Sequence, residues 1–155
     1  MSIARNSKYM ESKVLTASQP QLHLMLLEGA VRFGQRALQE GADDQRAAET
    51  DQLLVRLLNI VEELSRSTSG RDSEISVQLE EEYAFLYREL TAARVNLDLP
   101  KLEKCLEILS YQRDTWKQAC EQMEFAADTS TSKSVLPPLD HSAMPESPSS
   151  FSLDA

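Results

Sequence analysis

The sequence predicts an all-α protein built as an antiparallel, up-down-up-down four-helix bundle. Helix-forming residues dominate up to about residue 126, and glycine occurs only four times in 155 residues. Apolar residues recur at spacings of three and four in four successive stretches, which is the periodicity of a helix with a buried side. The breaks between these stretches are short, and short connections favour antiparallel neighbours.

Three segments are expected along the chain. Residues 1–17 form a short N-terminal lead, residues 18–126 form the bundle, and residues 127–155 form a disordered tail. The tail is rich in serine and proline and holds few large apolar residues. A segment of this composition cannot bury enough apolar surface to fold by itself.

The first bundle helix is predicted over Ser18–Gln39. Ser18 is a good N-cap, and Gln21 three residues later completes a capping-box pattern. Pro20 falls in the first turn, where its missing N–H does little harm. Gly41 is expected to end the helix.

The other three helices are predicted over Asp44–Arg66, Asp72–Leu97 and Pro100–Ala126. The first of these is broken by the run from Ser67 to Gly70. Pro100 suits an opening turn. In the helix from Asp44 the main apolar stripe is Leu54, Leu57, Leu58, Val61 and Leu64, widened by Leu53 and Ile60. In the helix from Asp72 it is Leu79, Tyr83, Leu86, Leu90, Ala93 and Leu97. In the helix from Pro100 it is Leu102, Leu106, Leu109, Trp116, Cys120 and Met123.

The first helix carries two apolar stripes, although a bundle helix needs one. The two stripes are Leu22, Met25, Leu26, Gly29, Phe33 and Ala37, and, rotated away from them, Leu24, Leu27, Val31 and Leu38. Surplus apolar surface marks an interaction site. A groove that takes an amphipathic partner helix would use it. The sequence therefore predicts a binding protein.

Charge and composition exclude several classes of function. The net charge is −9 and no Lys/Arg cluster is present, so binding to nucleic acid or to an anionic membrane is not expected. No apolar run is long enough to span a membrane, and no secretory signal is visible. Cys105 and Cys120 are expected to be buried, reduced thiols. A cytoplasmic protein is expected.

Catalytic and metal-binding patterns are missing from the sequence. The two histidines, His23 and His141, do not follow a Glu at the spacing of a di-iron site, and no Cys/His cluster has zinc spacing. No Gly-rich phosphate loop occurs. We therefore expect no enzyme activity, no metal and no cofactor.

Two alternatives to a simple binding role remain open. His23 could be a phosphotransfer site on an exposed helix, although Glu28 stands where such domains usually place a basic residue before the glycine. We instead expect His23 at the surface or lining a groove. The other alternative is a structural or regulatory bundle that associates with itself through the surplus stripes.

Several motifs together resemble those of the flagellar secretion chaperone FliS family. The matching stretches are Tyr9 followed by Val14-Leu15-Thr16-Ala17-Ser18; Leu22-x-x-Met25-Leu26-x-x-Gly29-Ala30; and Arg113-Asp114-Thr115-Trp116-Lys117. The resemblance covers roughly residues 5–125. The chain has Gln19-Pro20 where the family usually has Ser-Pro at the cap, and Leu27-Glu28 where it usually has Tyr-Asp.

The resemblance implies a cytosolic chaperone that binds the C-terminal segment of flagellin. Such a protein keeps flagellin from polymerising early and presents it for type III export. The bound segment would wrap the bundle, and residues 1–17 would act as a lid in the free protein, through Tyr9, Met10, Val14 and Leu15. Export-gate or regulatory flagellar proteins as further partners, and a homodimer of the free protein, are left open.

The candidate residues for the partner-binding groove come from the second stripe and from the neighbouring helices. They are Leu24, Leu27, Val31, Leu38, Leu53, Leu57, Ile60 and Tyr87. Periodicity alone does not say which of them face the core.

Overall fold

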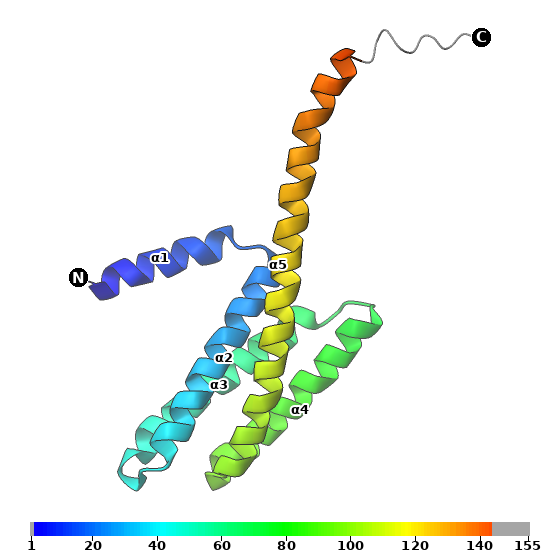
Figure 1. Cartoon of the computed structure of the whole chain (residues 1–155). Helices are drawn as coiled ribbons and strands as arrows, with labels where there is room; N and C mark the ends of the chain where they lie inside the picture. Colours follow the sequence, from blue (N-terminus) through cyan, green and yellow to red (C-terminus); the bar gives the residue numbers. More distant parts are fainter. Residues whose placement is uncertain (1, 144–155) are drawn as a thin grey trace. The chain divides into compact units, whose positions relative to one another are not determined.

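The computed structural model describes residues 2–143 and, within them, the side chains of residues 7–13 and 16–129. Every regular element in this described part is helical (Figure 1). The elements are α1 (Ser2–Thr16), α2 (Gln19–Gly41), the 3₁₀ turn η1 (Asp44–Arg46), α3 (Ala47–Thr68), α4 (Glu74–Asn96) and α5 (Leu99–Ala143). The chain divides into two units, residues 1–117 and 118–155.

The first unit contains the antiparallel bundle, in which α3 packs between α2 and α4. The first part of α5 completes it, because Leu106 lies against Gly34 of α2 and the Lys101 ammonium is 2.9 Å from the Glu89 carboxylate of α4. Both the all-α class and the antiparallel packing are thereby confirmed. The N-terminal lead, α1, is itself a helix.

The start of α2 follows the prediction closely. The Ser18 hydroxyl accepts a hydrogen bond from the Gln21 N–H, and the Gln21 side chain accepts one from the Ser18 N–H at 2.9 Å. Gly41 ends the helix for a different reason than expected. It is buried without a positive φ, and a Cβ there would lie 2.8 Å from Leu99 Cδ2. This glycine permits close packing.

Two of the other boundaries differ slightly from the predicted ones. The stretch from Asp44 forms η1 before α3 begins, because the Asp43 carboxylate accepts a hydrogen bond from the Gln45 N–H and holds a tight turn. The C-terminal end of α4 is the second boundary, and this helix stops where Leu97 adopts a left-handed conformation with φ 47°. Asp98 then caps α5 by accepting from the Lys101 N–H at 3.1 Å.

The last helix runs beyond its predicted end near Ala126. It continues to Ala143, so residues 127–143 of the predicted tail are helical, and residues 144–155 lie outside the described part. The predicted end rested on a change in composition. No cap or glycine stands at that point, and Ala126, Ala127 and Asp128 can continue a helix.

The core-facing seam of α2 is made largely of small residues at heptad spacing. Its members are His23, Leu27, Ala30, Gly34, Ala37 and Gly41, all of them buried. Small residues let helix backbones approach closely, and a Cβ on Gly34 would lie 2.1 Å from Leu106 Cδ2. The more strongly apolar stripe that includes Leu22 and Met25 is only half-buried. The core side of α2 thus takes residues from both stripes, since Leu27 and Val31 of one and Gly29 and Ala37 of the other are buried.

The seams of the other helices are more conventional. In α4 the predicted stripe is confirmed in part, since Tyr83, Leu86, Leu90 and Ala93 are buried, whereas Leu79 is half-buried and Leu97 is 41% exposed. The buried seam of α3 is Thr50, Leu54, Leu57, Val61, Leu64 and Thr68. The buried seam of α5 within the first unit is Leu102, Cys105, Leu106, Leu109 and Gln112. Burial of a leucine side chain contributes about 2 kcal/mol, so these positions supply most of the stabilisation of the bundle.

Both cysteines are free and buried, as expected. Burial, aided by the nearby Glu89 carboxylate, raises the pKa of the Cys105 thiol to about 11. Because the thiolate is the reactive form, Cys105 is an unreactive part of the core at neutral pH.

Candidate functional site

A hollow of about 640 Å³ lies between the first turns of α2 and the end of α3. It is lined by Met10, Gln19, Leu22, His23, Met25, Leu26, Glu63, Ser67 and Arg71. Its apolar residues come from α1 and α2. Its rim on the other side is polar and comes from α3 and from the turn that follows it. Such a combination suits an amphipathic ligand.

The apolar lining continues along α2 beyond this hollow. A Cβ on Gly29 would lie 3.4 Å from Ile60 Cδ1 of α3, so the two helices stay in contact there. One turn further on, the Arg56 guanidinium of α3 lies 5.7 Å from the centre of the Phe33 ring. We call the half-buried residues along this line the α2–α3 strip; they are Leu22, Met25, Leu26, Phe33 and Ile60.

His23 forms the floor of the hollow and joins four helices. Its Nε2 is 2.6 Å from the Tyr83 hydroxyl of α4, and its Nδ1 is 3.5 Å from the Ser67 hydroxyl of α3. Its ring stacks on Trp116 of α5 with centroids 4.1 Å apart. With 6% of its surface exposed, His23 is a core residue that also lines the hollow. Of the two positions expected for it, the surface one is wrong and the groove-lining one is supported. A phosphotransfer role loses its main support, because the ring is neither exposed nor free.

The environment of His23 keeps its imidazole neutral at physiological pH. Burial, assisted by the positive charge of Arg71, lowers the pKa of His23 from 6.5 to about 4. The neutral ring carries one N–H donor and one acceptor nitrogen, so it can bond with both hydroxyls. The Tyr83 hydroxyl is also buried, which raises its pKa.

We expect the stability of the bundle to fall between pH 6.5 and pH 4 through His23. The unfolded chain binds a proton near pH 6.5 and the folded chain only near pH 4, so stability is full above the first value and declines below it. The loss attributable to His23 should reach about 3 kcal/mol. Urea unfolding across this range measures it. In His23→Gln, which cannot titrate, this part of the decline should vanish; an unchanged pH profile would show that another group is responsible.

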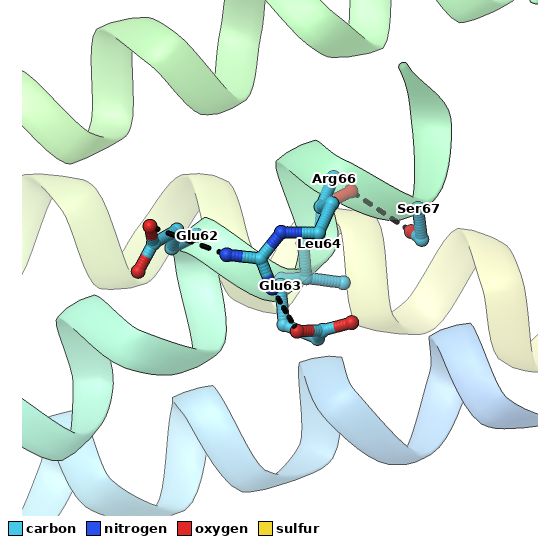
Figure 2. Close-up of polar contacts among 5 residues, drawn as sticks. All are labelled: Glu62, Glu63, Leu64, Arg66 and Ser67. Atoms are coloured by element: carbon cyan, nitrogen blue, oxygen red, sulfur yellow. Dashed lines mark hydrogen bonds and ion pairs between the residues drawn. The ribbon is translucent and has the colours of Figure 1, made fainter. Parts of the chain in front are cut away.

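Arg66 fixes the two carboxylates beside the hollow (Figure 2). Its guanidinium lies 3.3 Å from Glu62 and 2.6 Å from Glu63, one on either side. The adjacent Ser67 hydroxyl donates to the Leu64 carbonyl at 2.9 Å. Glu63 therefore lines the hollow with its carboxylate held from within α3, by an arginine that it shares with Glu62.

A second hollow, of about 530 Å³, lies on the other side of α3, against α4. It is lined by Glu62, Ser65, Arg66, Tyr83, Ala84, Tyr87 and Arg88. Tyr87, one of the predicted groove residues, is 41% exposed here. It is thus separated by α3 from the hollow beside α2.

Four of the predicted groove residues prove to be core residues. Leu27 and Leu57 are fully buried, and Val31 and Leu53 are nearly so, which removes them from any surface groove of this conformation. The correction follows from the small-residue seam of α2, which turns Leu27 inward.

The remaining predicted groove residues keep some exposed surface. Leu24, Leu38 and Ile60 are half-buried, and Tyr87 is exposed. Only Ile60 belongs to the α2–α3 strip. The residues that line the main hollow, Leu22, Met25 and Leu26, belong to the other stripe and were not among the predicted groove residues.

The predicted lid residues are described only in part. Tyr9 is 66% exposed and Met10 is 44% exposed, and Met10 lines the hollow. The side chains of Val14 and Leu15 lie outside the described part, although both positions fall within α1.

The described part of the chain contains neither a metal site nor a membrane-spanning helix. Among residues 2–143, no group of three His, Cys, Asp or Glu side chains is placed to hold a metal ion. Within the same range, no helix combines the length and apolar character needed to cross a membrane.

Comparison with known proteins decides the family. The family model described as flagellar protein FliS matches residues 1–123. The chain belongs to the FliS family. It is 31% identical over 113 residues to the flagellar secretion chaperone FliS of Bacillus subtilis (strain 168), which covers 73% of this chain and 84% of that protein.

The structure gives the FliS-like motifs of this chain physical roles. Trp116, in the motif Arg113–Lys117, stacks on His23, and Arg113 pairs with the Asp114 carboxylate at 3.1 Å. Leu27, which stands where the FliS family usually has tyrosine, is fully buried. At that position the present chain offers no surface to a partner.

Proposed function

We propose that this FliS-family protein is a cytoplasmic export chaperone for flagellin. It binds the C-terminal segment of flagellin, prevents premature polymerisation and delivers flagellin to the flagellar type III export apparatus. It acts by binding and not as an enzyme. The observation that carries this proposal is the apolar α2–α3 strip, which opens into the main hollow beside a polar rim.

The strip has the properties that such a ligand needs. A disordered segment that folds on binding loses conformational entropy, so the chaperone must offer an extended apolar contact to offset it. From Leu22 to Phe33 the strip spans eleven residues of α2, or about 16 Å by helical rise. An amphipathic helix with apolar residues at spacings of three and four fits along it.

The lid is part of the same proposal. Residues 1–17 cover part of the binding surface in the free protein and leave it when flagellin binds, with Tyr9, Met10, Val14 and Leu15 as the contacting side chains. Support comes from Met10, which already lines the hollow. Export-gate or regulatory flagellar proteins would then meet the loaded complex.

We expect a C-terminal flagellin fragment to form a stoichiometric complex with the full chain, and Met25→Asp to weaken it at least tenfold. The substitution removes apolar contact worth about 1.5–3 kcal/mol from the hollow and places a charge there. Titration calorimetry measures the affinity, and circular dichroism checks that the helices persist.

Val95→Asp is the matched control, because Val95 is 77% exposed on α4 and far along the chain from the strip. It should bind like the unmodified protein. The absence of both binding heat and co-elution at tens of micromolar would refute the proposal. Light scattering of the free protein tests the alternative: a stable homo-oligomer that ignores the fragment would identify self-association as the function of the strip.

A further inference from the structure

The main hollow has an arginine, Arg71, on its rim. Glu63 and Arg71 are the two charged residues among its described lining. Glu63 is 2.6 Å from the Arg66 guanidinium, which also holds Glu62, as Figure 2 shows. Glu63 is therefore held from within α3 and not by Arg71, and Arg66, shared by two carboxylates, leaves one negative charge there.

Arg71 lies in the exposed turn between α3 and α4, directly after Gly70, whose φ is +80°. Within the described part of the chain it forms no ion pair, whereas the neighbouring carboxylate of Glu80 accepts a hydrogen bond from Ser69. Its guanidinium is thus available to a ligand. Arginine suits this role because its planar donors match a carboxylate in two-point contact.

A smaller hollow of about 190 Å³ adjoins the main one. It shares Gln19, His23, Ser67 and Arg71 with it. Its full lining is Gln19, Pro20, His23, Ser67, Thr68, Arg71, Ile75, Ser76, Leu79 and Trp116. Arg71 is the charged residue in this set, and the described lining contains no carboxylate. The same guanidinium therefore lines both partly apolar hollows, and no carboxylate of the described lining faces it in the smaller one.

We propose that Arg71 is a specificity-determining residue that binds a carboxylate of the export substrate while the adjacent hollow takes its apolar side chains. The preferred ligand is an amphipathic segment with an acidic group next to its apolar face. That group is either an Asp or Glu side chain or the carboxylate at the end of the chain. This inference rests on the proposed function, since it concerns the same hollow.

The test compares the full chain with Arg71→Gln and Arg71→Glu, using a C-terminal flagellin fragment in titration calorimetry. Loss of a charge-assisted hydrogen bond should weaken binding roughly 5- to 30-fold in Arg71→Gln. Arg71→Glu should weaken it further, and Arg71→Lys should keep part of the affinity. Affinity of the unmodified protein should also fall with added salt more steeply than that of Arg71→Gln.

Arg88→Glu is the matched control, because it makes the same change of charge in the hollow on the other side of α3. It should bind almost normally. Two further fragments separate the sources of the carboxylate: one is amidated at its C-terminus, and the other has Asn and Gln in place of Asp and Glu. The fragment that lacks the recognised carboxylate should bind the unmodified protein no better than the original fragment binds Arg71→Gln.

Failure of the proposed role of Arg71 can be distinguished from failure of the proposed function. A fragment that binds the unmodified protein and Arg71→Glu equally well would overturn the role of Arg71 and leave the proposed function standing. Equal losses in Arg71→Glu and Arg88→Glu would also overturn it, because overall charge would then be the cause. A fragment that does not bind the unmodified protein at all would overturn both.

Discussion

Leu27→Asp should be largely unfolded, whereas Met25→Asp, two positions earlier on the same helix, should keep its helical structure. Leu27 is fully buried in the core, and no cation lies there to compensate a carboxylate. The cost of an unpaired buried charge, added to that of the lost leucine, exceeds the roughly 5–15 kcal/mol that holds a typical domain together. Met25 is half-buried at the hollow, where an Asp side chain can reach water.

Far-ultraviolet circular dichroism and urea titration compare the two variants directly. Leu27→Asp should lose most of its helical signal and its cooperative transition, while Met25→Asp should show a transition close to that of the unmodified protein. A folded Leu27→Asp that fails to bind flagellin would contradict the placement of Leu27 in the core. It would instead support the prediction that Leu27 belongs to the groove.

Gly34→Ala should destabilise the bundle by about 1–3 kcal/mol, even though alanine is the better helix former. A Cβ at this position would lie 2.1 Å from Leu106 Cδ2 and about 3 Å from the rest of that side chain. Leu106 is itself buried, so it cannot simply move aside. The urea midpoint should therefore fall while the slope of the transition stays the same.

Gly29→Ala is the control for this substitution. The nearest atom to its new methyl group would be Ile60 Cδ1 at 3.4 Å, an ordinary contact, so this variant should be neutral or up to about 1 kcal/mol more stable. Combining Gly34→Ala with Leu106→Ala should cost less than the sum of the two single changes, because each relieves the other. Strict additivity would show that the two side chains do not compete for the same space.

The features of the fold that depend on neighbouring residues could be predicted from the sequence. The capping box of Ser18 and Gln21, and the apolar heptads from Leu79 to Ala93, are local patterns with local physical causes. The end of α5 was harder to predict because no cap marks it. The predicted boundary near Ala126 followed composition, which reports the average character of a segment and not its last turn.

The binding surface could be predicted in kind but not in position. Surplus apolar surface was predicted from the two stripes of α2, and groove residues were predicted in the stripe of Leu27 and Val31, which the structure buries. The core side of α2 is instead chosen by close approach to α5 at Gly34 and Gly41. A pattern of hydrophobicity does not register this choice, since glycine and alanine add little to an apolar stripe. Heptad spacing of the small residues was the available signal.

His23 shows the same limit for a polar residue. Its contacts with Tyr83 and Trp116 join residues that are 60 and more positions apart in the chain. The residues next to His23 in the sequence do not predict these partners. A lone histidine among leucines therefore looks like a surface residue, although it is the polar centre of the bundle.

The small-residue seam of α2 also separates two kinds of evolutionary freedom. Substitutions at Ala30, Gly34 or Ala37 change the spacing of helix backbones and so affect the whole bundle. Exchange of one large side chain for another at Leu22, Met25 or Leu26 alters the shape of the hollow while the backbone contact stays in place. A chaperone built this way can follow the drift of its export substrate, residue by residue, without having to redesign its own fold.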